Sequence, residues 1–279
     1  MKRARFLILA AVLSGGVDAA AANGAETNHV RAELVGETTS IQPGQPFWVA
    51  VRLEMDQGWH VNWINPGDAG LAPRIEWALP EGFAAGDIRW PYPERFAVPE
   101  LSMFGYEGSV SLMVEIRPPS ALGHERVELR ARVTWLACRD VCIPGEAQVV
   151  LALPVDARTP QDDAGLAGEF EATRRRIPAV SSAWRFSARV TDERIIISAI
   201  PRGTHATPVE AMVFYPVDQG IIENAVEQKL EKTVKGYDLA IARARIGIDK
   251  LARIRGVLVS PEGWGPVSRN ALEIDVPVE

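Results

Sequence analysis

The sequence predicts an all-β protein of two β-sandwich domains joined by a short helical linker. Apolar and polar residues alternate with a period of two through most of the chain, which is the pattern of half-buried strands. Turns containing Gly and Pro separate these segments at short spacing, as in a sandwich. One stretch between the two β-rich parts has helical spacing instead. We therefore expect a first domain over residues 30–155, a linker over 156–183 and a second domain over 184–279.

The strands of the first domain follow from this alternation. Phe47–Met55 alternates throughout, and Val127–Trp135 has the most regular pattern in the chain. The alternation returns at Ala147–Val155, after a short segment that holds both cysteines. The other short strands of this domain are expected at Pro73–Trp77, Gly86–Trp90 and Ser109–Ile116.

The linker is expected to be a helix. Thr159 and Pro160 have the residue types of an N-cap and a first helical position. Pro178 is expected to end the helix, and Arg174–Arg176 fall in its last turn, where cations suit the helix dipole and are expected to be solvated. Residues at helical spacing between these limits are Leu166, Phe170, Thr173 and Ile177.

The second domain repeats the β pattern without any recognisable site. It contains no cysteine, and its single histidine, His205, lies in a segment flanked by Pro and Gly. We expect the second domain to have a structural or docking role. Its strands are expected at Phe186–Val190, Ile195–Ile200, Ala211–Tyr215, Tyr237–Ala242, Ile254–Val259 and Ala271–Val276.

The first residues predict export. Lys2, Arg3 and Arg5 precede the apolar run Phe6–Leu13, and small residues at 19–22 form a cleavage zone, so residues 1–22 read as a secretory signal peptide. The apolar run is far short of the roughly 20 residues that span a bilayer, and no cysteine near the cleavage zone could carry a lipid anchor. We expect a soluble, non-membrane-spanning protein of the periplasm.

Composition and motifs exclude several function classes. The formal charge of −6 disfavours nucleic acid, because phosphate binding needs clustered Lys and Arg. The chain has no G-x-S-x-G element, no Gly-rich phosphate loop and no C-x-x-C-H haem motif. A structural zinc site needs four ligands, and the chain has only one pair of cysteines, which disfavours such a site. We predict no metal and no cofactor.

The cysteine pair, Cys138 and Cys142, is the main candidate site. It lies between two predicted strands, so the two thiols can form a disulfide that is either structural or redox-active. A loop of five residues stabilises a fold by only about 2 kcal/mol in loop-entropy estimates, which weakens the structural explanation. Ile143-Pro144-Gly145 follows the pair instead of the helix that activates a thioredoxin thiolate. From the residues alone, exchange and a structural bond stay equally open.

Two aromatic segments accompany the pair. Gly58–Gly70 is rich in Trp, Asn and Gly and contains Trp59, His60 and Trp63. These side chains are either sandwich core or a rigid surface beside the cysteines. The segment Met103-Phe104-Gly105-Tyr106 places apolar groups on an expected loop, where a large apolar side chain often covers something.

These motifs together resemble a known family. The run G-W-H-V-N-W-I-N-P-G-D-A-G, then M-F-G-Y-E-G, then W-L-A-C-R-D-V-C-I-P-G-E-A is similar to the periplasmic N-terminal domain of the DsbD family of thiol:disulfide interchange proteins. The ScsB-type branch, which has a second β domain, is the most similar. The resemblance covers most of residues 30–279, and its specific motifs lie between Gly58 and Ala147.

The resemblance implies a fold and an activity. The fold is an immunoglobulin-like sandwich, and Cys138 and Cys142 cycle between dithiol and disulfide as part of a protein-disulfide reductase system. Met103, Phe104 and Gly105 match the cap loop that shields the cysteines. The other residues expected to line the active site are Trp59, His60, Trp63, Tyr106 and Arg139.

The partners follow from the same resemblance. Thioredoxin-like periplasmic proteins are expected to receive electrons. The chain ends at Glu279 without the family's membrane and thioredoxin domains, so a separate membrane donor of the DsbD type is expected. The main alternative is a non-enzymatic binding or chaperone-like module with a structural disulfide. A weaker one is Cu(I) binding by Cys138, Cys142 and Met103, which are soft ligands.

Overall fold

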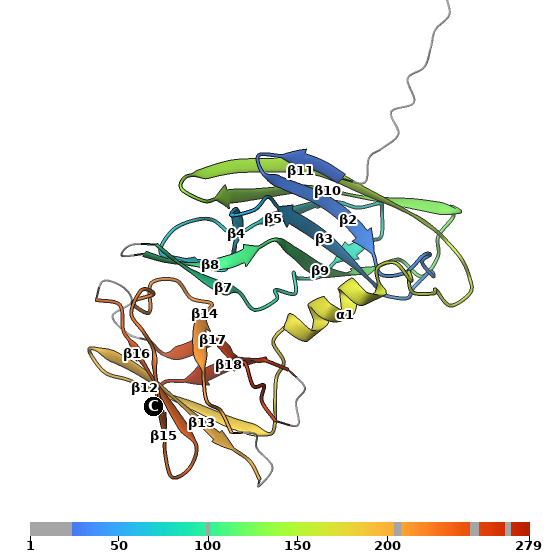
Figure 1. Ribbon diagram of the computed structural model, residues 1–279. Helices are drawn as coiled ribbons and strands as arrows, with labels where there is room; N and C mark the ends of the chain where they lie inside the picture. Colours follow the sequence, from blue (N-terminus) through green and yellow to red (C-terminus); the bar gives the residue numbers. More distant parts are fainter. Residues whose placement is uncertain (1–23, 99–100, 204–207, 246–250, 266–268) are drawn as a thin grey trace, which may run out of the picture.

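The structure is a computed structural model that describes residues 24–98, 101–203, 208–245, 251–265 and 269–279. Two β-rich units lie on either side of one helix (Figure 1). The predicted signal peptide and His205 fall outside the described residues. Within the described part of the chain, no helix combines the length and the apolar character needed to cross a membrane.

The first unit is a sandwich of two mainly antiparallel sheets. One sheet has the order β1-β2-β3-β9-β6, built from β1 (Gly24–Thr27), β2 (Val30–Gly36), β3 (Phe47–Met55), β9 (Ser109–Arg117) and β6 (Ala84–Ala85). The other has the order β11-β10-β4-β8-β7, with a further strand, β5 (Arg74–Ala78), paired to β10. Its members are β11 (Cys142–Pro154), β10 (Arg126–Cys138), β4 (His60–Gly67), β8 (Leu101–Glu107) and β7 (Glu94–Val98).

The core of the first unit lies between these sheets, because each strand buries alternate side chains. Val49, Val51 and Leu53 of β3 are fully buried, as are Leu129 and Val133 of β10. The predicted strands at 47–55, 109–116, 127–135 and 147–155 are confirmed. The prediction of a strand at Gly86–Trp90 is wrong, because that segment forms no continuous ladder with β9. Gly86 N–H donates to the Glu115 carbonyl, and Arg89 forms an isolated bridge with Met113.

The helix α1 (Ala167–Arg176) starts later than predicted. Thr39 N–H donates to the Gln161 carbonyl, and Asp163 N–H donates to the Glu37 carbonyl, so the chain before the helix stays extended beside the first unit. The helix begins only after the Asp163 carbonyl has accepted the N–H groups of Leu166 and Ala167. Its end before Pro178 is as predicted.

The arginines at the end of the helix are not simply solvated, contrary to expectation. The Arg174 guanidinium lies 2.5 Å from a carboxylate oxygen of Glu37, which ties α1 to the first unit. Arg176 Nη2 donates to the Tyr92 carbonyl at 3.2 Å, and its guanidinium lies over the Tyr92 ring. The linker therefore packs on the first unit at two places.

The second unit also has two antiparallel sheets. Around Trp264, which is fully buried, Trp184 and Phe186 pack edge-on at 5.1 and 5.9 Å. The sheet order β12-β13-β16-β15 uses β12 (Trp184–Val190), β13 (Arg194–Pro201), β16 (Tyr237–Ala242) and β15 (Lys229–Lys232). The order β14-β17-β18 uses β14 (Val213–Pro216), β17 (Arg253–Val259) and β18 (Ala271–Pro277). The predicted all-β fold class is confirmed.

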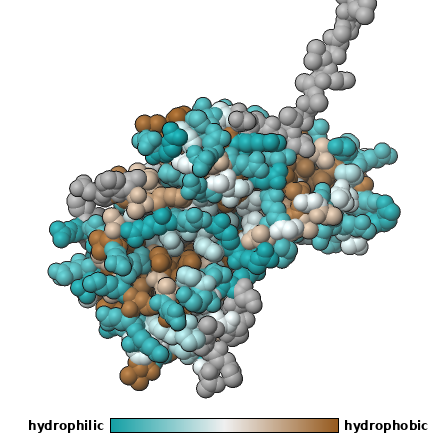
Figure 2. Space-filling view, viewed as in Figure 1, coloured by the Kyte–Doolittle hydropathy of each residue, from teal (hydrophilic) through white to brown (hydrophobic). Residues whose placement is uncertain are grey.

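The two units share apolar contacts. Tyr215, Val257 and Ala271 of the second unit belong to the hydrophobic cluster of the first. Asn65 Nδ2 donates to the Pro216 carbonyl at 2.8 Å in a buried hydrogen bond between the units. Elsewhere, the face of the molecule in Figure 2 is mostly hydrophilic, with hydrophobic residues in small separate groups. The domain boundaries given above stay a prediction.

Candidate redox site

The two cysteines form a disulfide at the tip of the β10–β11 hairpin. The strands pair over their whole length, from Arg126 opposite Pro154 to Cys138 opposite Cys142. The Cα atoms of the cysteines are 4.0 Å apart. A three-residue turn connects them, in which Arg139 N–H donates to the Val141 carbonyl at 3.0 Å. The long ladder thus presents the disulfide at a defined position on the surface.

The two sulfur-bearing residues differ in exposure. Cys138 is 1% exposed, whereas Cys142 is an exposed residue beside Val141, which is 63% exposed. A thiolate of another protein can therefore approach Cys142 and not Cys138. Thiol–disulfide exchange depends on which sulfur is accessible to attack, so the geometry distinguishes the two positions chemically.

Strand register shows which side chains share the face of the disulfide. Residues directly opposite one another in an antiparallel ladder point to the same side of the sheet, and neighbours along a strand alternate. Cys138 lies opposite His60, and His60 lies opposite Glu107. Every second side chain of β8 points to the same face, so Met103 is on the face of Glu107. Met103 lies opposite Phe96 of β7. Four strands, β10, β4, β8 and β7, therefore contribute to one face.

Phe96 and His60 meet on this face. Their rings are stacked, with centroids 4.7 Å apart and planes 13° apart. The His60 side chain is buried, and its Nε2 has no hydrogen-bond partner. Burial lowers the pKa of His60, and the nearby Glu107 carboxylate only partly opposes this effect. A neutral imidazole under an aromatic ring therefore lies at the position opposite Cys138.

The predicted cap residues lie in strand β8 and not in a loop. Met103 is on the face of the disulfide, but Phe104 is on the opposite face, where its ring meets Tyr215 edge-on at 5.1 Å. Gly105 lies where a Cβ would come within 2.2 Å of the Val61 carbonyl oxygen. The aromatic residue in contact with His60 is Phe96, which sequence reasoning did not select.

Trp59 and Arg139 form a contact beside the turn. The Arg139 guanidinium carbon lies 5.1 Å from the centroid of the Trp59 ring, within cation–π range. Trp59 also stacks on His29 with centroids 4.0 Å apart, and His29 Nδ1 lies 2.8 Å from a carboxylate oxygen of Asp56. His29 was not predicted, because it is remote in sequence and isolated in the β1–β2 turn.

Trp63 and Tyr106, which were predicted to line the site, lie on the core face of the same sheet. Trp63 is two residues after Val61 in β4, so both side chains point to the core. The Trp63 ring meets the Tyr215 ring edge-on, with centroids 6.4 Å apart. The Tyr106 hydroxyl donates to the Pro91 carbonyl at 2.7 Å. Burial raises the pKa of Tyr106 well above its usual value, so it stays a neutral hydrogen-bond donor.

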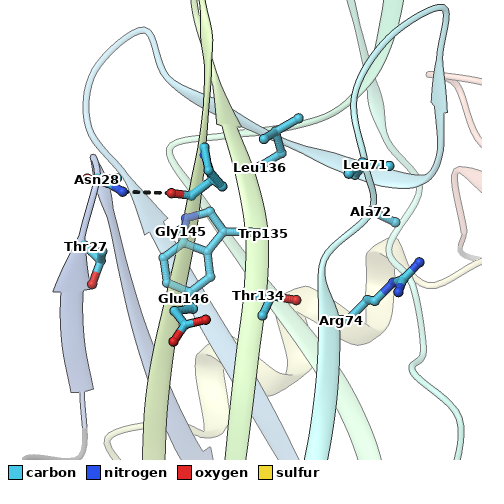
Figure 3. Close-up of a pocket in the computed structure, with 11 residues that line it drawn as sticks. Thr27, Asn28, Leu71, Ala72, Arg74, Thr134, Trp135, Leu136, Gly145 and Glu146 are labelled. Atoms are coloured by element: carbon cyan, nitrogen blue, oxygen red, sulfur yellow. Dashed lines mark hydrogen bonds between the residues drawn. The ribbon is translucent and has the colours of Figure 1, made fainter.

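A cavity of about 530 Å³ adjoins the hairpin (Figure 3). The Trp135 indole forms part of its wall and packs on Gly145, where a Cβ would approach the indole nitrogen to 2.4 Å. Asn28 Nδ2 donates to the Pro144 carbonyl across one side at 2.8 Å. Pro144 lies opposite Leu136, two ladder steps from the disulfide. A hollow with apolar and polar lining residues thus lies along the hairpin, and its nearest lining residue in β11 is two residues from Cys142.

Comparison with known proteins assigns the first unit to a family. Residues 31–154 match the family described as the N-terminal part of the thiol:disulfide interchange protein DsbD. No curated protein matches the chain. The N-terminal periplasmic domain of ScsB from Proteus mirabilis is similar in structure, with a TM-score of 0.59, 17% identity, 91% of this chain covered and 95% of that one.

Two chaperones, DraB and the periplasmic chaperone SfaE, are much less similar. DraB from E. coli has a TM-score of 0.24 at 10% identity, with 88% of this chain and 96% of that chain covered. SfaE has a TM-score of 0.21 at 10% identity, with 88% and 98% covered. Scores this low carry no argument. The family match and the ScsB-like, immunoglobulin-like fold agree: residues 31–154 are a DsbD-family N-terminal domain.

Proposed function

We propose that this protein carries out thiol–disulfide exchange through Cys138 and Cys142. The observation that supports this most is the unequal exposure of the two cysteines at a hairpin tip, within a domain of the DsbD family. An exchange protein needs one accessible sulfur for its partner and one protected sulfur to complete the reaction. A purely structural cross-link has no need of this asymmetry.

The reaction is a relay of two electrons. In the dithiol form, the Cys142 thiolate attacks one sulfur of a partner disulfide and forms a mixed disulfide, releasing the partner's other sulfur as a thiolate. The Cys138 thiolate then attacks Cys142 Sγ, which breaks the mixed disulfide and releases the second partner thiolate. The partner is reduced, and the Cys138–Cys142 disulfide seen here is the oxidised product. A dithiol donor restores the starting state by the reverse sequence.

The proposed partners are thioredoxin-like proteins of the periplasm, and the proposed donor is a separate membrane protein of the DsbD type. The family of residues 31–154 supports both proposals. The cavity beside the hairpin is open next to Leu71, which is 64% exposed, and offers an apolar contact for a protein surface that approaches Cys142. Periplasmic location after cleavage of residues 1–22 belongs to the same proposal.

Trapping with single-cysteine variants tests the exchange. Cys138→Ser leaves Cys142 free to form a mixed disulfide that cannot be completed, so we expect it to accumulate a covalent complex with a thioredoxin-like protein. Cys142→Ser is the matched control, and it should capture little because Cys138 is buried. Absence of a complex with either variant contradicts exchange, and capture by Cys142→Ser alone contradicts the assigned order.

The alternative is a binding or chaperone-like module with a structural disulfide. The reduction potential separates it from the relay, since structural disulfides lie below about −300 mV and thioredoxin-like exchange pairs lie higher. We also propose that residues 30–155 and 184–279 are separate domains joined by 156–183. Limited proteolysis followed by mass analysis tests these boundaries, and cleavage within β10 or β13 of the native protein contradicts them.

A further inference from the structure

We propose that the second unit acts as a positioning surface for the redox site, by holding the β7–β8 hairpin in place against His60 and Cys138. The inference rests on the proposed exchange function and gives the second unit a role in it. The residues that act are Tyr215 and Asn224, together with the backbone carbonyl of Ala225. None of them lies near the disulfide in sequence, and all act through the hairpin.

The hairpin has two faces with different neighbours. Phe96 lies opposite Met103, and this pair points to the side of the disulfide, where Phe96 stacks on His60. One step along, Arg95 lies opposite Phe104, and this pair points to the other side. Both members of the second pair contact the second unit. The hairpin is therefore a thin layer between the second unit and the residue opposite Cys138.

A chain of hydrogen bonds fixes the polar side of this layer. Asn224 Nδ2 donates to Asp68 Oδ1 at 2.7 Å, and Asp68 Oδ2 accepts the Ser102 N–H of β8 at 2.7 Å. Asp68 N–H donates to the Ser102 carbonyl as well, at 3.0 Å. Asp68 thus joins the second unit to the backbone of the hairpin. Because one carboxylate oxygen of Asp68 binds Asn224 and the other binds Ser102, a substitution at Asn224 should alter the position of Ser102.

Arg95 makes the second polar connection. Its Nε donates to Ser102 Oγ at 3.0 Å, and its Nη2 donates to the Ala225 carbonyl at 2.9 Å. Arg95 is the immediate neighbour of Phe96 in β7. A shift of the loop that carries Asn224 and Ala225 therefore displaces the strand that places Phe96 on His60.

The aromatic contact supplies the apolar part of the surface. The Tyr215 ring meets Phe104 edge-on at 5.1 Å and Trp63 at 6.4 Å, and it belongs to the hydrophobic cluster of the first unit. Phe104 is almost fully buried by this arrangement. The Tyr215 ring therefore gives the side of β8 opposite the disulfide an apolar contact with the second unit.

The test measures access to the disulfide without any protein partner. The second-order rate of reduction by dithiothreitol is followed by mass after thiol alkylation, in the full chain. Asn224→Asp places a carboxylate against Asp68 and should break the connection. Loss of one such hydrogen bond should raise the equilibrium constant for local opening of the β7–β8 hairpin by roughly fivefold. We expect the rate of disulfide reduction to increase by about the same factor. The variant Y215A should act in the same direction.

A charge exchange provides the decisive control. In the double variant Asp68→Asn with Asn224→Asp, the new amide can still accept the Ser102 N–H and can donate to the new carboxylate. We expect it to return the reduction rate towards that of the unchanged protein. Arg253→Ala removes an exposed ion pair with Asp275 elsewhere in the second unit and should leave the rate unchanged. Tyr215→Phe keeps the ring and should also leave it unchanged.

Thermal unfolding of each variant separates access from general destabilisation. Equal reduction rates in Asn224→Asp, Tyr215→Ala and the unchanged protein, with all three folded, would overturn the proposal. Failure of the double variant to restore the rate would overturn the Asp68 connection. Trapping of a partner by Cys138→Ser is a separate measurement, so a failure of the exchange function and a failure of this positioning role give different results.

Discussion

The imidazole of His60 lies flat against the ring of Phe96, 4.7 Å between centroids, at the ladder position opposite Cys138. The contact unites β4 and β7 with the end of β10, three strands that are not consecutive in the chain. Cys138, next to this stack in the ladder, is buried, while Cys142 is exposed at the end of the turn. Access to Cys138, as opposed to Cys142, should therefore depend on this pair of rings.

Removal of the Phe96 ring should increase the rate of reduction. In Phe96→Ala, His60 loses its stacked cover, so small thiols should attack Cys138 as well as the exposed Cys142 and reduce the disulfide several-fold faster. Phe186→Ala removes a half-buried aromatic ring from the second unit and serves as the control. The rate of disulfide reduction by glutathione measures the effect. Unchanged kinetics in Phe96→Ala would show that the ring does not limit access.

His60 should make the protein less stable in mild acid. Burial lowers the pKa of His60 in the folded state, so the unfolded chain binds this proton first as the pH falls below about 6.5. The free energy of unfolding should then decrease from pH 7 towards the lowered pKa and level off below it. Urea unfolding at several pH values measures this, and in His60→Gln the decrease should be smaller. Parallel curves for the two proteins would contradict the assignment.

Gly105 should not tolerate any side chain. A Cβ there would lie 2.2 Å from the Val61 carbonyl oxygen and 3.1 Å from the Asn62 Cα, so β4 and β8 would have to separate. We expect Gly105→Ala to lower the free energy of unfolding by about 2 kcal/mol or more. Gly123→Ala is the matched control, because nothing lies within 4 Å of its Cβ position. Denaturant unfolding compares them, and equal stabilities would show that the strands adjust without cost.

Reduction of the disulfide should leave the fold intact. The β10–β11 ladder and the buried core hold the hairpin, and the loop that the bond closes is short. The expected loss is therefore only about 2 kcal/mol. Calorimetry with and without a phosphine reductant measures the change in Tm. Unfolding at room temperature on reduction would instead indicate a structural role for the bond.

Alternation predicted the strands that bury one face fully. β10 and β11 follow the pattern over most of their length, and the cysteines, expected on the connection between them, are the residues that end β10 and begin β11. β7 and β8 were missed as strands because Pro91, Pro93 and Pro99 surround them and mark a loop. Pairing with β4 overrides that local signal, since β8 satisfies its backbone groups in the sheet.

Which side chains lie beside the disulfide depends on how the strands pair residue by residue, and a single sequence does not reveal that register. Met103 and Phe104 are neighbours, yet they point to opposite faces, and only the first lies on the side of the disulfide. Phe96 gave no signal beyond being one aromatic residue in a Pro-rich stretch. The role of Tyr215 depends on how the two units pack, which no local pattern encodes.

The β1–β2 turn contacts residues of the candidate redox site. Asn28 and His29 both have positive φ, at 51° and 68°, and both reach across to it, through the Pro144 carbonyl and the Trp59 ring. A protein expressed without this turn would lack His29, and the Trp59 ring that contacts Arg139 would lose its stacking partner. Such a truncated protein could fold around the main core and still show altered disulfide chemistry, so a shortened chain is a poor reference for measuring the native potential.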